Sequence, residues 1–129
     1  MAAFALTITG LATDVVAIPV TAGASTIAAG RGVSPAGSVP DTTDPAGEEL
    51  FGLTVHPTLA NGKVLVVNRG TVYVSNTLTP GQSLVLVGST GLFDYEANLA
   101  SGERYLVLGN VTGTNELEVQ VRNTTYQKP

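Results

Sequence analysis

The stretch Glu116-Leu117-Glu118-Val119-Gln120-Val121-Arg122 alternates between polar and apolar side chains at every step. Successive side chains of an extended strand point to opposite faces, so Leu117, Val119 and Val121 would share one face. An alternation of period two over this length predicts a β-strand with one face on a core and the other in water.

Two earlier runs are apolar at every position, namely Leu84-Val85-Leu86-Val87 and Tyr105-Leu106-Val107-Leu108. Runs of this length and composition are typical of strands that are covered on both faces. Two such strands need two covers. A closed barrel or sandwich could supply both, or another subunit could supply one of them.

Shorter apolar segments predict further strands at Phe51–Val55, Val64–Val67 and Thr71–Ser75. Asn61-Gly62, between the first two, offers the positive φ angles of a tight hairpin turn. The best helical candidate, Asp94–Ala100, is short and has no useful i, i+4 apolar stripe. The sequence therefore predicts an all-β fold, a small β-barrel or sandwich.

The chain also repeats itself. Thr26-Ile27-Ala28-Ala29-Gly30 matches Thr77-Leu78-Thr79-Pro80-Gly81, and Gly37 matches Gly88 at the same spacing. Further on, Phe51–Val55 matches Leu108–Val111, and Val64–Asn68 matches Glu118–Asn123. Two copies are too few for a solenoid. We therefore expect one domain, residues 21–129, built from two similar halves at about 21–75 and 76–123 that share a core.

Residues 1–20 lie outside the repeat and look extended, because Leu6 and Ile8 alternate with Thr7 and Thr9. We expect an extended N-terminal arm or an edge strand that could reach a neighbouring subunit. No Lys or Arg precedes Arg31, and Asp14 and Pro19 interrupt the apolar residues. The segment is therefore a poor candidate for a signal peptide or a membrane span.

Charged residues make up only 12 % of the chain, about half the usual share. A surface so poor in charge suits a protein that packs against neighbours. The formal net charge is −4, and the six Lys and Arg residues are dispersed along the sequence. We therefore expect no binding to nucleic acid, whose phosphate backbone needs a basic patch. The absence of Cys excludes disulfides and thiolate metal sites.

Catalytic motifs are missing. The single histidine, His56, precedes Pro57 and is more typical of a structural or exposed residue. No G-x-S-x-G elbow occurs, and Gly62-Lys63 lacks the other residues of a phosphate-binding loop. The segment Asp41–Glu49 is acidic, but its carboxylates match no calcium loop, so we interpret it as a solvated loop. We predict no enzyme activity, no cofactor and no metal.

The order of the remaining motifs resembles the capsid-cement, or head-decoration, proteins of tailed bacteriophages. The motifs that carry the resemblance span about residues 20 to 123: Gly70-Thr71-Val72-Tyr73-Val74, Leu78-Thr79-Pro80-Gly81-Gln82-Ser83-Leu84, Gly88-Ser89-Thr90-Gly91-Leu92-Phe93, Leu108-Gly109-Asn110-Val111 and Leu117-Glu118-Val119-Gln120-Val121. The resemblance implies a β-domain that binds the outside of an assembled capsid, often as a trimer, and clamps adjacent subunits of the major capsid protein against internal DNA pressure.

By the same resemblance, the protein would be made in the host cytoplasm and located on the outer capsid surface of the virion. We expect the apolar side chains of the N-terminal segment to contact the capsid or a neighbouring subunit. These side chains are Phe4, Leu6, Ile8, Leu11, Val15, Val16 and Ile18. The alternative is a carbohydrate-binding or adhesin-like β-domain, which without Trp would depend on a tyrosine platform.

Overall fold

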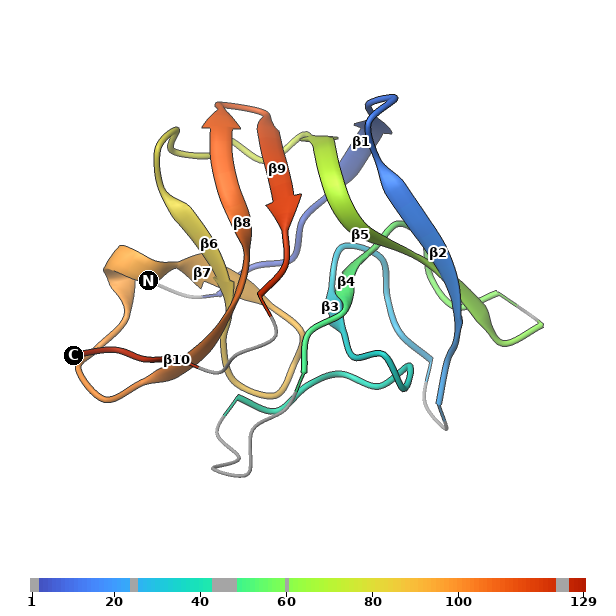
Figure 1. The fold of residues 1–129 in the computed structure, drawn as a ribbon, viewed down its shortest axis with the longest axis horizontal. Helices are drawn as coiled ribbons and strands as arrows, with labels where there is room; N and C mark the ends of the chain where they lie inside the picture. Colours follow the sequence, from blue (N-terminus) through green and yellow to red (C-terminus); the bar gives the residue numbers. More distant parts are fainter. Residues whose placement is uncertain (1–2, 24–25, 43–48, 60, 123–125) are drawn as a thin grey trace.

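The structure is a computed structural model and describes residues 3–23, 26–42, 49–59, 61–122 and 126–129. These residues form an all-β fold in which one sheet curls into a nearly closed barrel, as the sequence predicts (Figure 1). The elements are β1 Ile8–Leu11, β2 Val16–Thr21, β3 Gly32–Val33, β4 Gly52–Thr54, β5 Lys63–Val74, β6 Ser83–Leu86, β7 Phe93–Tyr95, the 3-10 helix η1 Glu96–Asn98, β8 Arg104–Gly113, β9 Glu116–Gln120 and β10 Tyr126–Gln127.

The helical candidate at Asp94–Ala100 is a strand end followed by the single turn η1. The sequence also separated Val64–Val67 from Thr71–Ser75 at Gly70, whereas β5 runs through both segments. Gly70 has a φ of 114° and stays within the strand. A glycine at a β-bulge allows a strand to bend without ending, so it reads as a break in the sequence. Most of the acidic segment Asp41–Glu49, residues 43–48, lies outside the described residues.

The sheet follows the order β3-β4-β5-β9-β8-β6-β7, and its neighbours are antiparallel. The long strand β5 pairs with four others. On one edge it contacts β4 through Val66 and Val67, and β9 through Arg69 to Tyr73. On the other edge it contacts β2 and β1, which follow each other antiparallel to it. β5 is therefore the strand on which the barrel is assembled.

The N-terminal segment closes this barrel together with a direct hydrogen bond, in which Gly32 N–H of β3 donates to the Gly91 carbonyl before β7 at 3.0 Å. The backbones of Phe4 and Phe93 exchange two hydrogen bonds of 2.8 Å, which join the segment to β7 at one end of the sheet order. Leu6 N–H then donates to the Gly30 carbonyl at 3.1 Å, and Ile8 pairs with Val74 of β5. Residues 4 to 11 thus connect β7, the last strand of the sheet order, to β5 (Figure 1).

The core fills the barrel, and its covers come from the same chain. Leu84 and Leu86 of β6 face the main cluster, which also contains Leu53, Phe93 and Leu117. The side chains that alternate with these along the strands point to the opposite face of the sheet, where they belong to two smaller clusters. One gathers Val85, Leu99 and Tyr105 outside β6 and β8; the other gathers Val20, Ile27, Val33, Val64 and Val66 beside β5. The doubly apolar strands therefore need no second subunit to cover them.

The strand register repeats between the two halves. β3 pairs with β4 through Gly32 with Leu53 and Val33 with Gly52. The corresponding residues of the second half make the corresponding pairs of β6 with β8, namely Ser83 with Asn110 and Leu84 with Gly109. The loop hydrogen bonds repeat too: Gly30 N–H donates to the Thr54 carbonyl at 2.8 Å, and Gly81 N–H donates to the Val111 carbonyl at 2.9 Å.

The third strand of each half follows the same register. Leu53 pairs with Val67, and Asn110, its counterpart, pairs with Glu118. The structure thus matches Val67 to Glu118, a different alignment from the sequence match, because an alternating apolar pattern fits itself at several registers. By this correspondence Arg69 matches Gln120, and these two residues pair with each other. A local pseudo-twofold axis therefore passes between β5 and β9.

In each half, a glycine lies where two neighbouring strands come very close together, and the two glycines are at equivalent positions. A Cβ atom on Gly52 would lie 2.1 Å from the Val67 carbonyl oxygen, and one on Gly109 would lie 2.0 Å from the Glu118 carbonyl oxygen. Val67 and Glu118 are the matched positions described above. Each half therefore depends on a glycine that lets β4 or β8 lie flush against the next strand.

We predict that Gly52→Ala and Gly109→Ala each destabilise the domain by about 3 kcal/mol or more, since backbone atoms must move to admit the methyl group. Gly62→Ala is the control, because its Cβ would meet no atom within 4 Å and only its φ of 77° is unfavourable. That change should cost about 1 kcal/mol. Urea unfolding measures all three; similar values for Gly109→Ala and Gly62→Ala would contradict the close approach.

Candidate functional site

The predicted contact residues differ in how much of their surface is exposed to solvent. Leu6 is in the main core with 2 % of its surface exposed, and Phe4, Ile8 and Val15 are half-buried against the same core. Leu11, Val16 and Ile18 are exposed, at 38 %, 36 % and 38 %. The segment is thus integrated into the barrel, and only these last three side chains remain for contacts. We call Leu11, Val16 and Ile18 the edge strip. Val16 and Ile18 share one face of the sheet, whereas Leu11 pairs with the core residue Val72 and lies toward the other face.

The edge strip lies along an open side of the sheet, because the described residues place no strand on the far side of β2. Ala22 N–H donates to the Gly62 carbonyl at 2.8 Å, which fixes the phase of the ladder between β2 and β5. Pro19 faces Leu65, whose carbonyl accepts from Val55 on the β4 side. The Pro19 nitrogen therefore points toward the open side, where it has no N–H to offer an added strand.

A pinned bulge separates β1 from β2. Asp14 Oδ1 accepts from Thr71 N–H at 3.1 Å, and its Oδ2 accepts from the Thr71 hydroxyl at 3.3 Å. Ala12 N–H donates to the Thr71 carbonyl at 3.0 Å. A Cβ on Gly70 would lie 2.5 Å from the Val15 Cα atom, so the bulge rests directly on β5. These contacts hold Leu11 and Val16 on either side of the bulge in fixed positions.

An open, polar hollow of about 400 Å³ lies beside this bulge and across the pseudo-twofold axis. Its lining carries both signs of charge, from Asp14 and Glu118 and from Arg69.

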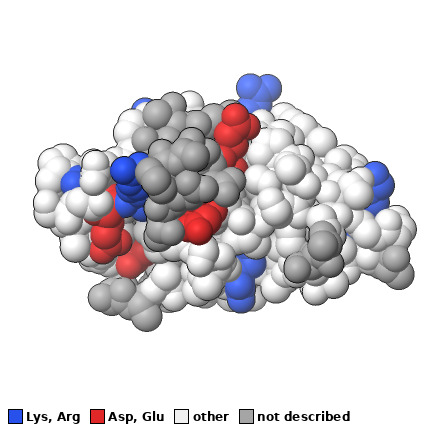
Figure 2. All heavy atoms as spheres, turned by 90° about the horizontal axis from the view of Figure 1, so that it is seen from below, with Lys and Arg blue, Asp and Glu red and all other residues white. Residues whose placement is uncertain are grey.

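Elsewhere charge is sparse. On the face shown in Figure 2, charged side chains are scattered among broad uncharged areas. Among the residues coloured there, no continuous basic area of the kind that binds a phosphate backbone is visible.

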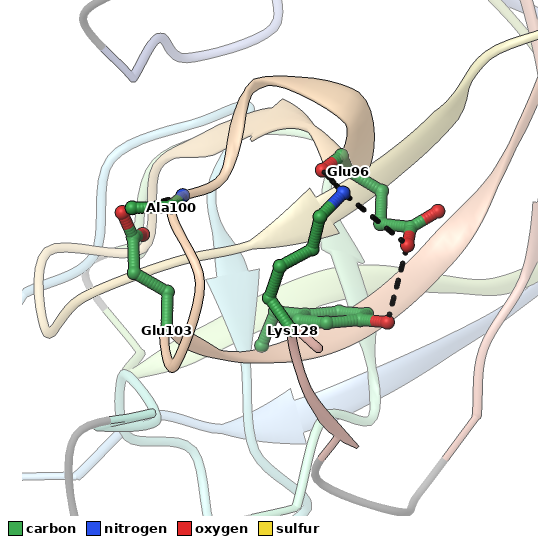
Figure 3. A network of polar contacts seen from close by, with 5 residues as sticks. Glu96, Ala100, Glu103 and Lys128 are labelled. Atoms are coloured by element: carbon green, nitrogen blue, oxygen red, sulfur yellow. Dashed lines mark hydrogen bonds and ion pairs between the residues drawn. The ribbon is translucent and has the colours of Figure 1, made fainter.

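A network of polar contacts holds β10 in place (Figure 3). Lys128 Nζ donates to the Glu96 carbonyl at 2.9 Å and lies 3.8 Å from Glu96 Oε1. The Tyr105 hydroxyl donates to the same Oε1 at 3.4 Å, and the Tyr105 and Tyr126 rings stack with centroids 5.7 Å apart. Burial raises the pKa of Tyr105 above its ordinary value, and the nearby Glu96 carboxylate raises this pKa further. These contacts hold β10 against the small cluster that contains Val85, and their role is structural.

The remaining candidates for chemistry lie apart from one another. His56 Nδ1 donates to the carbonyl of the adjacent Pro57 at 2.7 Å and so holds a turn. Within the described ranges, no three His, Asp or Glu side chains come close enough together to hold a metal ion. The described part of the chain likewise contains no helix long and apolar enough to cross a bilayer.

Comparison with models of protein families, with curated proteins and with solved structures found no match to this chain. The class of the protein is therefore given by its fold: an all-β barrel of two similar halves.

Leu6 and Leu11 offer a matched test of how the N-terminal segment is used. We predict that Leu6→Ala destabilises the domain by about 2–5 kcal/mol, because it leaves a cavity in the main core. Leu11→Ala should change stability by no more than about 0.5 kcal/mol, because its side chain is exposed. Thermal and urea unfolding would measure both variants. Equal, small effects would mean that the segment is not part of the core.

The raised pKa of Tyr105 predicts a loss of stability at alkaline pH. The folded state holds this proton more tightly than the unfolded state, whose tyrosine pKa is near 10. The contribution is complete below pH 10 and is lost as the pH rises through the folded-state pKa. Urea midpoints measured from pH 8 to 11 should fall less for Tyr105→Phe than for the wild type. An exposed control, Tyr73→Phe, should follow the wild type; identical curves for all three would contradict this.

Proposed function

We propose that this is a non-enzymatic structural protein that binds the outer surface of an assembled bacteriophage capsid and stabilises it by bridging subunits of the major capsid protein. The observation that carries the proposal is the edge strip, three exposed apolar side chains on an open sheet edge of a chain with few charges. The order of motifs from Gly70 to Val121 supports the same role. The virion surface would be its location after synthesis in the host cytoplasm.

The strip suits docking because it is ordered before contact. Leu11 belongs to β1 and Val16 and Ile18 to β2, and both strands pair with β5. A flexible arm would lose conformational entropy when it bound, whereas side chains on a paired strand lose only their rotamer freedom. The sequence predicts contact through an extended N-terminal arm or an edge strand. Pro19 favours contact through side chains instead, because it interrupts the donors of the open edge.

A single edge strip is a small contact for holding a subunit on a capsid. Full burial of one Val, Leu or Ile side chain is worth about 1.5–3 kcal/mol, and about two-thirds of each side chain in the strip is already buried. Covering the rest contributes about 0.5–1 kcal/mol each. A micromolar complex needs about 8 kcal/mol, so one strip cannot hold a subunit on a shell alone. Several linked copies, such as a trimer, would provide the missing affinity by avidity.

The proposal predicts that Val16→Lys and Ile18→Lys each reduce binding to expanded capsid shells at least tenfold, because a charge would be buried at the contact. Both side chains are exposed, so the melting temperature should hardly change. Thr112→Lys on the exposed part of β8 adds the same charge away from the strip and should bind as the wild type does.

Co-sedimentation with expanded and unexpanded shells of the phage that carries the gene measures this binding. We expect saturable binding of the wild type to expanded shells. Failure of the wild type to bind either shell would overturn the proposed function. Full binding by both lysine variants would leave the function in place but overturn the edge strip as its contact.

A further inference from the structure

We propose that a groove around Tyr95 is a binding site for a neutral carbohydrate. Two adjoining hollows of about 300 Å³ and about 160 Å³ share Thr79 and Tyr95 in their walls. The first is also lined by Phe4, Asn76, Thr77 and Leu78, and the second by Gln82, Ala97 and Asn98. We call these residues together the Tyr95 groove. They come from the N-terminal segment, the loop between β5 and β6, and the end of β7 with η1.

The walls of the groove are fixed in advance by the closure of the barrel. The paired backbones of Phe4 and Phe93 place the Phe4 ring 5.9 Å from the Tyr95 ring, inclined at 53°. The Asn76 amide accepts from Thr7 N–H at 2.8 Å and donates to the Ala5 carbonyl at 3.1 Å. This amide thus ties the loop after β5 to the N-terminal segment. A preformed site loses little entropy when a ligand binds.

The polar groups that remain for a ligand are hydroxyls and amides. The backbone N–H of Leu78 donates to the Thr114 carbonyl at 2.7 Å, and that of Thr79 donates to the Tyr95 hydroxyl oxygen at 3.0 Å. The Thr79 carbonyl accepts from Gln82 N–H at 3.4 Å. These three backbone groups are therefore already used and are not free to pair with an extended peptide. The side chains of Thr77, Thr79 and Gln82 stay available on the groove walls.

This set of groups selects a neutral, polyhydroxylated ligand. Hydroxyls and amides can both donate and accept, as the alternating hydroxyls of a sugar require. The aromatic rings of Phe4 and Tyr95 provide an apolar surface for the C–H face of a sugar ring. None of the described lining residues carries a charge, so an acidic sugar or a charged peptide would lose hydration without gaining an ion pair.

The test is a nitrogen-15 NMR titration of the full chain with maltotriose, cellotriose and chitotriose. We expect saturable shifts confined to Thr77, Thr79, Gln82 and Tyr95 with at least one of these neutral trisaccharides. Thr77→Ala and Gln82→Ala should each weaken that binding about fivefold, the loss expected for one hydrogen bond. Tyr95→Phe keeps the ring and should retain most of the binding. Thr112→Ala, outside the groove, is the control and should bind as the wild type does.

Two comparison ligands distinguish the chemistry, a galacturonic acid trimer and a proline-rich peptide. Saturable shifts with either of these, and none with the neutral trisaccharides, would overturn the assignment. So would the absence of saturable shifts with every ligand, or neutral-sugar binding that Thr77→Ala and Gln82→Ala leave unchanged. The groove shares no residue with the edge strip, so this inference stands or falls separately from the capsid role.

Discussion

The fold depends on the pairing of the N-terminal segment along β5. β5 is twelve residues long and holds β4 and β9 on one edge and β1 and β2 on the other. The segment that supplies β1 and β2 also pairs with β7 through Phe4 and inserts Leu6 into the main core. It thus helps to join the two ends of the sheet order, which also meet where Gly32 N–H of β3 donates to the Gly91 carbonyl before β7.

The two halves of the closed barrel show how a short chain can build a core without disulfides or tryptophan. Each half contributes a loop glycine, two paired strands (β3 with β4, and β6 with β8) and a third strand at matching register. The third strands meet at Arg69 and Gln120. Elements without a counterpart in the other half break the symmetry: β1 and β2 flank β5, whereas β7, η1 and β10 flank β6 and β8. The edge strip and the Tyr95 groove both use these asymmetric additions.

The all-β fold and most strands could be predicted from local patterns. The spacing of apolar residues at Leu117 and Val119, and in the runs around Val85 and Leu106, is enough to indicate which side chains are buried. The closure of the barrel could not be predicted from local patterns, because the pairing of Ile8 with Val74 joins segments that are far apart in the sequence. For the same reason, the sequence could nominate Leu6 and Ile18 together but could not place one in the core and the other in water. The groove was missed because Phe4, Thr77 and Tyr95 share no motif.

Amide hydrogen exchange of the full chain tests the closure most directly. If the N-terminal segment is part of the barrel, the amides of Phe4, Leu6, Ile18 and Val20 should exchange nearly as slowly as those of β5 and β9, since all would open only with the cooperative unit. If those amides exchange at the rate of a free peptide while β5 and β9 stay protected, the segment is a detached arm and the account of the barrel given above is wrong.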